Sequence, residues 1–114
     1  MSIVIELFLS DFDADHQLLA LGGTTLLVLV SQGCAHCRFA QQCLPSMLLP
    51  VSHLAWIDAG ESPGLVQRYE VFHLPALFVV RDGYFHGALH ARLSAPELSK
   101  AVGEALARPA EELP

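Results

Sequence analysis

Two patterns of hydrophobic and polar residues alternate along this chain. Short apolar runs rich in β-branched and aromatic residues predict strands, and apolar residues at helical spacing after a capping residue predict helices. Residues 25–31 form an apolar run without alternation, which is typical of a strand covered on both faces. Further strands are predicted at residues 3–9, 54–58, 76–80 and 84–90, with a hairpin turn at residues 81–83.

Four helices are predicted between and after these strands. The first follows the capping residues 10–13 and stops at Gly22, and the second runs from residue 34 to about 49 with a bend or break at Pro45. A brief third helix opens at residue 62. The last is capped by Ser94 and ends at Pro109. On the second helix, Phe39, Cys43 and Met47 are predicted to form a buried stripe, with Cys43 as a small core residue.

The order of these elements is β-α-β-α-β-α-β-β-α, which predicts an α/β fold. Early alternation followed by a hairpin implies a mixed five-stranded sheet with helices on both faces. The chain has 114 residues, of which 53% are hydrophobic and 16% charged, as expected for one compact globular domain. We expect that domain to span residues 1–108 and the acidic tail, residues 109–114, to be frayed.

Charge and hydropathy exclude two classes of partner. The net charge is −6 and the six Lys and Arg residues are scattered, whereas nucleic-acid binding requires clustered basic residues. The longest apolar run, residues 26–30, is far too short to cross a membrane. The N-terminal stretch has neither the basic region nor the cleavage site of a signal peptide, so a cytoplasmic protein is expected.

Cys34 and Cys37 carry the candidate chemistry. They stand where a buried strand ends and a helix begins, and a two-residue spacing lets their sulfurs meet across the first helical turn. At the helix N-cap, unsatisfied N–H groups and the helix dipole are expected to lower the pKa of Cys34 below that of a free thiol, making it the nucleophile. Cys37 is expected to be buried and to resolve a mixed disulfide. Ala35 and His36 lie between them, and a protonated His36 would also stabilise the thiolate, although a merely solvated histidine is an open alternative.

A metal site is the competing interpretation of these cysteines. A structural zinc site usually needs four ligands, and one C-x-x-C pair supplies two. Cys43, His36 and His53 could add ligands, but no second C-x-x-C or paired-histidine motif is present. We therefore expect no metal and no cofactor beyond the Cys34–Cys37 pair.

The motif and its context resemble the thioredoxin superfamily over nearly the whole chain. The C-A-H-C motif follows the second predicted strand, "WID" at residues 56–58 resembles the family's third strand, and "YEVFHLPALFVVRDGYFHG" resembles the segment that holds its cis-proline and final hairpin. The resemblance implies that the Leu74–Pro75 bond is cis, that this pair lies beside the active-site disulfide, and that Leu74 pairs with a substrate strand. Gly33 and His73 are further candidate substrate-binding residues, and Phe72 is a candidate for either the core or the rim of the site.

The chain also departs from the family pattern. Gly33 replaces the usual aromatic residue before the first cysteine, and Ala35-His36 replaces the Gly-Pro of thioredoxin, which makes the motif more similar to disulfide isomerases and oxidases. Val28 stands where thioredoxin has a buried acid, and an apolar residue near Leu54 replaces its lysine partner. Cys37 would then depend on water or His36 for proton transfer.

These features predict a thiol–disulfide oxidoreductase that contributes to cell redox homeostasis. Its partners would be protein or peptide disulfides and an unidentified electron donor or acceptor. One segment also resembles thioredoxin-like proteins of hydrogenase maturation, which typically lack the cysteine pair and act by binding. A binding module or assembly chaperone without redox turnover is therefore the alternative.

Overall fold

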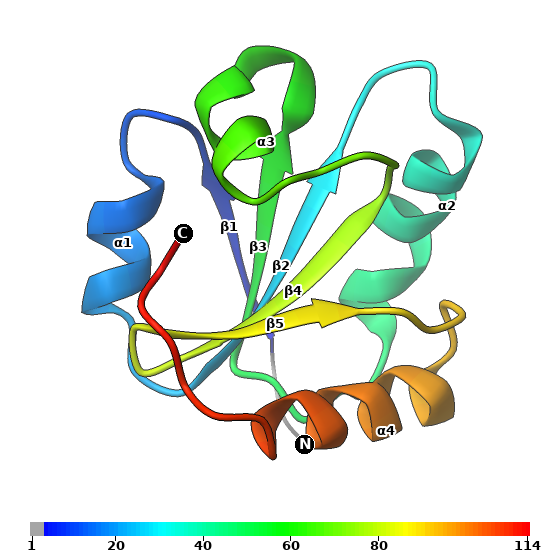
Figure 1. The fold of residues 1–114 in the computed structure, drawn as a ribbon. Coiled ribbons are helices and arrows are strands. Elements are labelled where there is room, and N and C mark those ends of the chain that lie inside the picture. Colours follow the sequence, from blue (N-terminus) through cyan, green and yellow to red (C-terminus); the bar gives the residue numbers. More distant parts are fainter. Residues whose placement is uncertain (1–3) are drawn as a thin grey trace.

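The computed structural model describes residues 4–114 and contains the nine predicted helices and strands in the predicted order (Figure 1). The first predicted strand begins at residue 3, outside the described residues, and the other strand bounds agree to within one residue of prediction. The elements are β1 (Ile5–Leu9), α1 (Ala14–Ala20), β2 (Thr24–Val30), α2 (Ala35–Cys43), β3 (His53–Asp58), α3 (Pro63–Arg68), β4 (Ala76–Arg81), β5 (Tyr84–Leu89) and α4 (Ala95–Leu106).

The five strands form one mixed sheet in the order β1-β3-β2-β4-β5, which confirms the predicted fold class. β1, β3 and β2 run parallel, whereas β4 is antiparallel to β2 and β5 is antiparallel to β4. In Figure 1 the helices α2 and α4 cover one face of this sheet, and α1 and α3 cover the other. Because β4 runs antiparallel to β2, the β2–α2 connection leaves the sheet beside the start of β4.

β2 lies at the centre of the sheet and every one of its residues is buried. Leu26, Val28 and Val30 pack into the core on the α2 and α4 side, and Leu27 and Leu29 pack into the core on the opposite side. Because successive side chains of a strand point to opposite faces, only an uninterrupted apolar run can supply both cores. This explains why the strand shows no alternation in the sequence.

The second helix is shorter than predicted. α2 ends at Cys43 and continues as a 3₁₀ turn, Leu44–Ser46, that contains Pro45. Proline has no N–H with which to continue the α-helical hydrogen bonding, so the chain changes to the tighter turn at that position.

The predicted buried stripe on α2 was wrong for Phe39, whose side chain is 53% exposed. Cys37, Ala40 and Leu44 are the buried residues instead, while Cys43 and Met47 are half-buried at the edge of the same core. A stripe one position later, through Ala40 and Leu44, satisfies the same helical spacing. The sequence periodicity therefore identified a helix, and contact with the sheet selected which face of the helix is buried.

The acidic C-terminal tail, predicted to fray, makes a defined pairing with the edge of the sheet. Glu111 forms a bridge to Phe85 through two backbone hydrogen bonds of 2.7 and 2.9 Å. Just before it, the Arg108 guanidinium donates to the carbonyl oxygens of His86 and Ala88 at 3.2 and 2.9 Å. These contacts satisfy carbonyl and amide groups on the outer edge of β5, which would otherwise be open to another strand.

Tyr69 occupies the core between α3 and the β4–β5 hairpin. Its ring packs edge-on against Phe78 and Phe85, with centroids 5.3 and 5.6 Å away. Its hydroxyl is buried and has no hydrogen-bond partner in the structure. Burial is the main cause that raises the pKa of Tyr69 to about 12; Asp15 adds to the rise and Arg68 opposes it.

We expect the parent protein to lose stability at alkaline pH because of Tyr69, and the Tyr69→Phe variant to be free of this loss. The unfolded tyrosine loses its proton near pH 10 and the folded one only near pH 12, so ionisation favours unfolding as the pH rises through this range. Relative to the parent, the variant should gain roughly 2–3 kcal/mol in unfolding free energy between pH 9 and pH 12. Urea denaturation at each pH would measure this, with Tyr84→Phe at an exposed position as the control. A parallel pH dependence in parent and Tyr69→Phe would contradict the assignment.

Candidate redox site

Cys34 and Cys37 meet at the start of α2, directly after the buried strand β2. Cys34 is the N-cap of the helix, with extended backbone angles, and its Sγ accepts a hydrogen bond from the N–H of Cys37 at 3.1 Å. The two sulfurs are joined as a disulfide, with Cα atoms 5.1 Å apart, inside the usual range for such bonds. The local structure thus brings both sulfurs within bonding reach and directs a backbone donor at one of them.

The two sulfurs differ in their access to solvent. Cys37 is fully buried in the core beneath α2, whereas Cys34 is only half-buried. Cys34 also lines a shallow cavity of about 410 Å³, together with residues that follow β2 and β3 or lie on α3 and the α3–β4 connection: Ser31, Ala59, Val66, Val71, Phe72, His73 and Leu74. A partner molecule can therefore reach Cys34, and not Cys37, from outside.

Leu74 and Pro75 lie next to Cys34 in space although they are distant in sequence. The peptide bond between them is cis, and the Leu74 carbonyl oxygen is 3.9 Å from the Sγ of Cys34. Antiparallel pairing of β4 with β2, with Ala76 opposite Leu29, brings the two segments together. The residues that the resemblance assigned to one site are thus adjacent.

The other candidate residues surround this contact. Gly33 is exposed in the turn before the helix, with φ +79°, a conformation that residues with a Cβ rarely adopt. His36, on the first turn of α2, and His73 are both exposed. They line a groove beside Pro75 whose volume is about 250 Å³.

The rim also holds His90, which was not assigned to it from sequence, and Phe72, which was a candidate for either the core or the rim. His90, which follows β5, lines the same groove, and Phe72 is 91% exposed beside His73. Counting residue pairs outward from the predicted hairpin turn would have brought His90 near Pro75, so a signal for it was present. The exposure of Phe72 depends on the path of the α3–β4 loop and has no local signature.

Neither a protein-family model nor a curated protein sequence matches the chain. Solved structures do match. A mutant thioredoxin from Halobacterium salinarum NRC-1 superposes with a TM-score of 0.66 at 15% identity, over 92% of this chain and 91% of that one. Thioredoxin from Trichomonas vaginalis gives a TM-score of 0.55 at 18% identity, over 69% and 73% of the two chains.

The chain has the thioredoxin fold. The zinc-bound form of human ERp44 also matches, with a TM-score of 0.65 at 16% identity over 86% of this chain, which spans 31% of that protein. At identities this low, the structural matches establish the fold alone. The Cys34–Cys37 pair fits the C-x-x-C motif expected within that fold. The predicted thioredoxin fold is therefore confirmed.

Within this thioredoxin fold, the surroundings of Cys37 are apolar. Val28, which stands where the resemblance implies a buried acid, is fully buried in the same core as Cys37, and so is Leu54. Among residues 4–114 the buried polar side chains are Thr24, Thr25, Ser62 and His86. No carboxylate in this part of the chain is buried, so Cys37 has no buried acid beside it there.

The competing metal hypothesis finds no ligand set in the part of the chain that the structure describes. There, no group of three or more His, Cys, Asp or Glu side chains is arranged to hold a metal ion. Cys43 is a free thiol at the far end of α2, with its Sγ 4.0 Å from the carbonyl oxygen of Ala40.

Among residues 4–114, no helix has the length and apolarity needed to cross a bilayer.

Proposed function

We propose that this protein is a thiol–disulfide oxidoreductase that acts on protein or peptide disulfides through Cys34 and Cys37. One observation carries the proposal: the two sulfurs are within bonding reach, one accessible at a helix N-cap and the other buried behind it. In the reduced protein the Cys37 N–H would donate to the Cys34 thiolate, which favours the charged, nucleophilic form. The thioredoxin fold supports this general chemistry.

The proposed reaction is two successive thiol–disulfide exchanges. The Cys34 thiolate attacks one sulfur of the substrate disulfide, a mixed disulfide forms, and the other substrate sulfur leaves as a thiolate that takes up a proton. Cys37 then loses its proton and attacks the Sγ of Cys34, which releases the second substrate thiol. The substrate gains two electrons and two protons, and the Cys34–Cys37 dithiol becomes the disulfide; the reverse sequence oxidises a substrate dithiol.

The substrate would lie extended against the segment before β4. The approach to Cys34 passes Leu74, whose backbone would pair with the substrate as a strand does, and Phe72 offers an exposed apolar contact at the rim. No cofactor is needed, since the two sulfurs carry both electrons. We further propose a cytoplasmic setting, a role in redox homeostasis and exchange of electrons with a donor or acceptor of the cell.

The proposal is tested first by the pH dependence of alkylation. In the reduced protein we expect Cys34 to react with iodoacetamide well below the pH, about 8.5, at which an ordinary thiol becomes half ionised. Mass spectrometry of peptides would assign the modified residue, and the half-buried Cys43 serves as an internal reference.

Catalysed reduction of a model protein disulfide, with dithiothreitol as the electron source, is the second measurement. The reduced protein should accelerate it, and Cys34→Ser should not. Equal rates for the parent and Cys34→Ser, together with an ordinary alkylation profile for Cys34, would favour the binding module over the oxidoreductase.

A further inference from the structure

One groove beside the candidate redox site is lined by three histidines and an arginine. It runs past Pro75 between the start of α2 and the end of β5, and its ten lining residues include His36, His73, His90 and Arg92. None of the ten is Asp or Glu. The whole chain carries a net charge of −6, with twelve acidic against six Lys and Arg residues. Basic and protonatable groups are thus gathered at this groove in an otherwise acidic protein.

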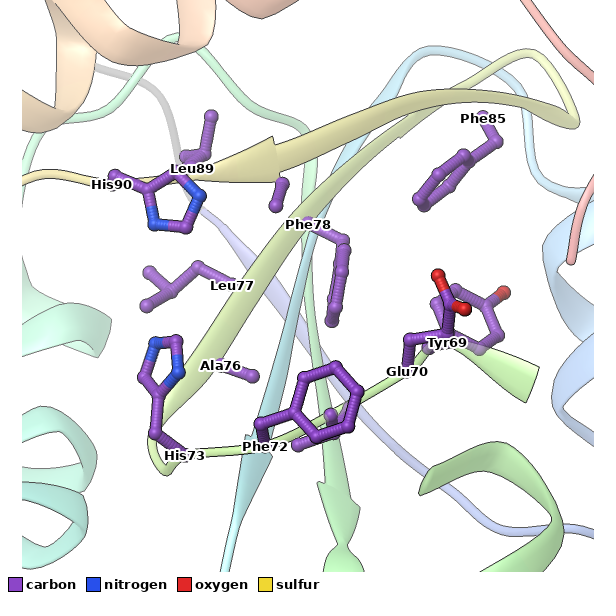
Figure 2. Close-up of a pocket in the computed structure, with 12 residues that line it drawn as sticks. Tyr69, Glu70, Phe72, His73, Ala76, Leu77, Phe78, Phe85, Leu89 and His90 are labelled. Carbon is purple, nitrogen blue, oxygen red and sulfur yellow. The ribbon is translucent and has the colours of Figure 1, made fainter. Parts of the chain in front are cut away.

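The histidines are placed to act on one ligand. The ring centroids of His73 and His90 are 6.4 Å apart, with the planes tilted by 31°. A second cavity adjoins the groove, and His73 and His90 line both. Figure 2 shows their rings at one end of this second cavity and Glu70 with Tyr69 at its other end. His36, His73, His90 and Arg92 are all exposed, so each can meet a bound molecule directly.

The lining of the groove can carry positive charge and holds no carboxylate to balance it. The Arg92 guanidinium is always charged, and histidine is the side chain whose charge changes between pH 5 and 8. Two protonated imidazoles at the separation of His73 and His90 repel each other, and a carboxylate bound beside both relieves that repulsion. Of the titratable groups that line the two cavities, only Glu70 is acidic at neutral pH, and it lies away from the rings.

We propose that this groove selects substrates in which acidic residues lie next to the reactive cysteine. The inference rests on the proposed oxidoreductase function and names its substrate class: a peptide segment with Asp or Glu close to its disulfide. Because the groove adjoins Leu74, whose carbonyl oxygen is 3.9 Å from the Sγ of Cys34, a segment joined to Cys34 would extend past the histidines. His73, His90 and Arg92 are therefore specificity-determining residues.

The test uses three peptide disulfides that are identical except at the two positions flanking the cysteine, which are Glu, Gln or Lys. Pre-reduced protein is mixed with each peptide at low ionic strength, and single-turnover rate constants are measured at pH 6 and pH 8. Since exposed charge pairs are individually weak, we expect the Glu peptide to react roughly threefold to tenfold faster than the Gln peptide at pH 6. The ratio should shrink at pH 8 and in high salt, and the Lys peptide should be slowest. Comparing peptides at one pH cancels the ionisation of Cys34 itself.

Charge variants separate recognition from a structural effect. The double variant His73→Gln, His90→Gln should lose most of the preference for the Glu peptide, and His73→Glu, His90→Glu should favour the Lys peptide. His16→Gln, at an exposed position on α1, and Arg81→Gln, at the end of β4, are matched controls that should keep the parent preference. Reversal by the Glu variants is a result that altered packing alone would not produce.

The outcomes distinguish this inference from the function on which it rests. If the reduced protein reacts with all three peptides at equal rates, the groove does not select charge, and the oxidoreductase proposal stands. If it reduces none of them, both proposals are overturned. A preference for Glu that persists unchanged in both double variants would also overturn the assignment to His73 and His90.

Discussion

Replacing Cys37 with serine is expected to trap substrates as stable mixed disulfides on Cys34. The sulfur of the buried Cys37 is the one bonded to Cys34 in the structure. Without it, the second exchange step has no nucleophile within the protein that is in reach of Cys34. Steady-state turnover should fall on the order of a hundredfold or more, equivalent to about 2.7 kcal/mol in activation free energy. The trapped complex should appear on a non-reducing gel and disappear when dithiothreitol is added.

Two further variants make the trapping experiment decisive. Cys34→Ser should form no complex at all, and serine is a good N-cap residue that can still accept the Cys37 N–H, so the helix start is kept. Cys43→Ser should turn over like the parent, because Cys43 lies at the other end of α2. Trapping by Cys34→Ser instead of Cys37→Ser would reverse the assigned roles, and trapping by neither would remove the exchange mechanism.

Truncating Leu26 to alanine is expected to give the largest loss of stability. Leu26 is fully buried at the centre of β2 and belongs to the core that also holds Cys37 and the inner faces of α2 and α4. Removing its buried methyl groups loses their transfer free energy and leaves a cavity, which together cost about 2–5 kcal/mol. This is a large share of the roughly 5–15 kcal/mol that stabilises a domain of this kind.

Urea denaturation of the oxidised proteins would measure the effect as a shift in midpoint at constant slope. Leu48→Ala is the matched control, because Leu48 is 70% exposed and its truncation should change the unfolding free energy by less than about 0.5 kcal/mol. Similar losses for Leu26→Ala and Leu48→Ala would contradict the burial of β2. A change of slope in Leu26→Ala would instead indicate a different denatured state or a loss of two-state behaviour.

The sequence identified Cys34 and Cys37 because their context is local. A buried strand, a turn with a glycine at positive φ and a helix N-cap lie within one short stretch, and each has a signature in neighbouring residues. The Leu74–Pro75 segment was assigned to the same site only through a family resemblance, since nothing near it in the chain points to Cys34. Its proximity depends on the pairing of β4 with β2, which is a long-range contact.

The sequence by itself determined the order and type of the elements, the burial of β2 on both faces and the place of the Cys34–Cys37 pair, because these follow from hydrophobic periodicity and capping within short windows. Tertiary structure decided which face of α2 is buried, so that Ala40 and not Phe39 enters the core. It also decided that His36, on the first turn of α2, lies beside Pro75, which precedes β4. Such choices depend on how distant strands register and how closely a helix approaches the sheet, and no local pattern records either one.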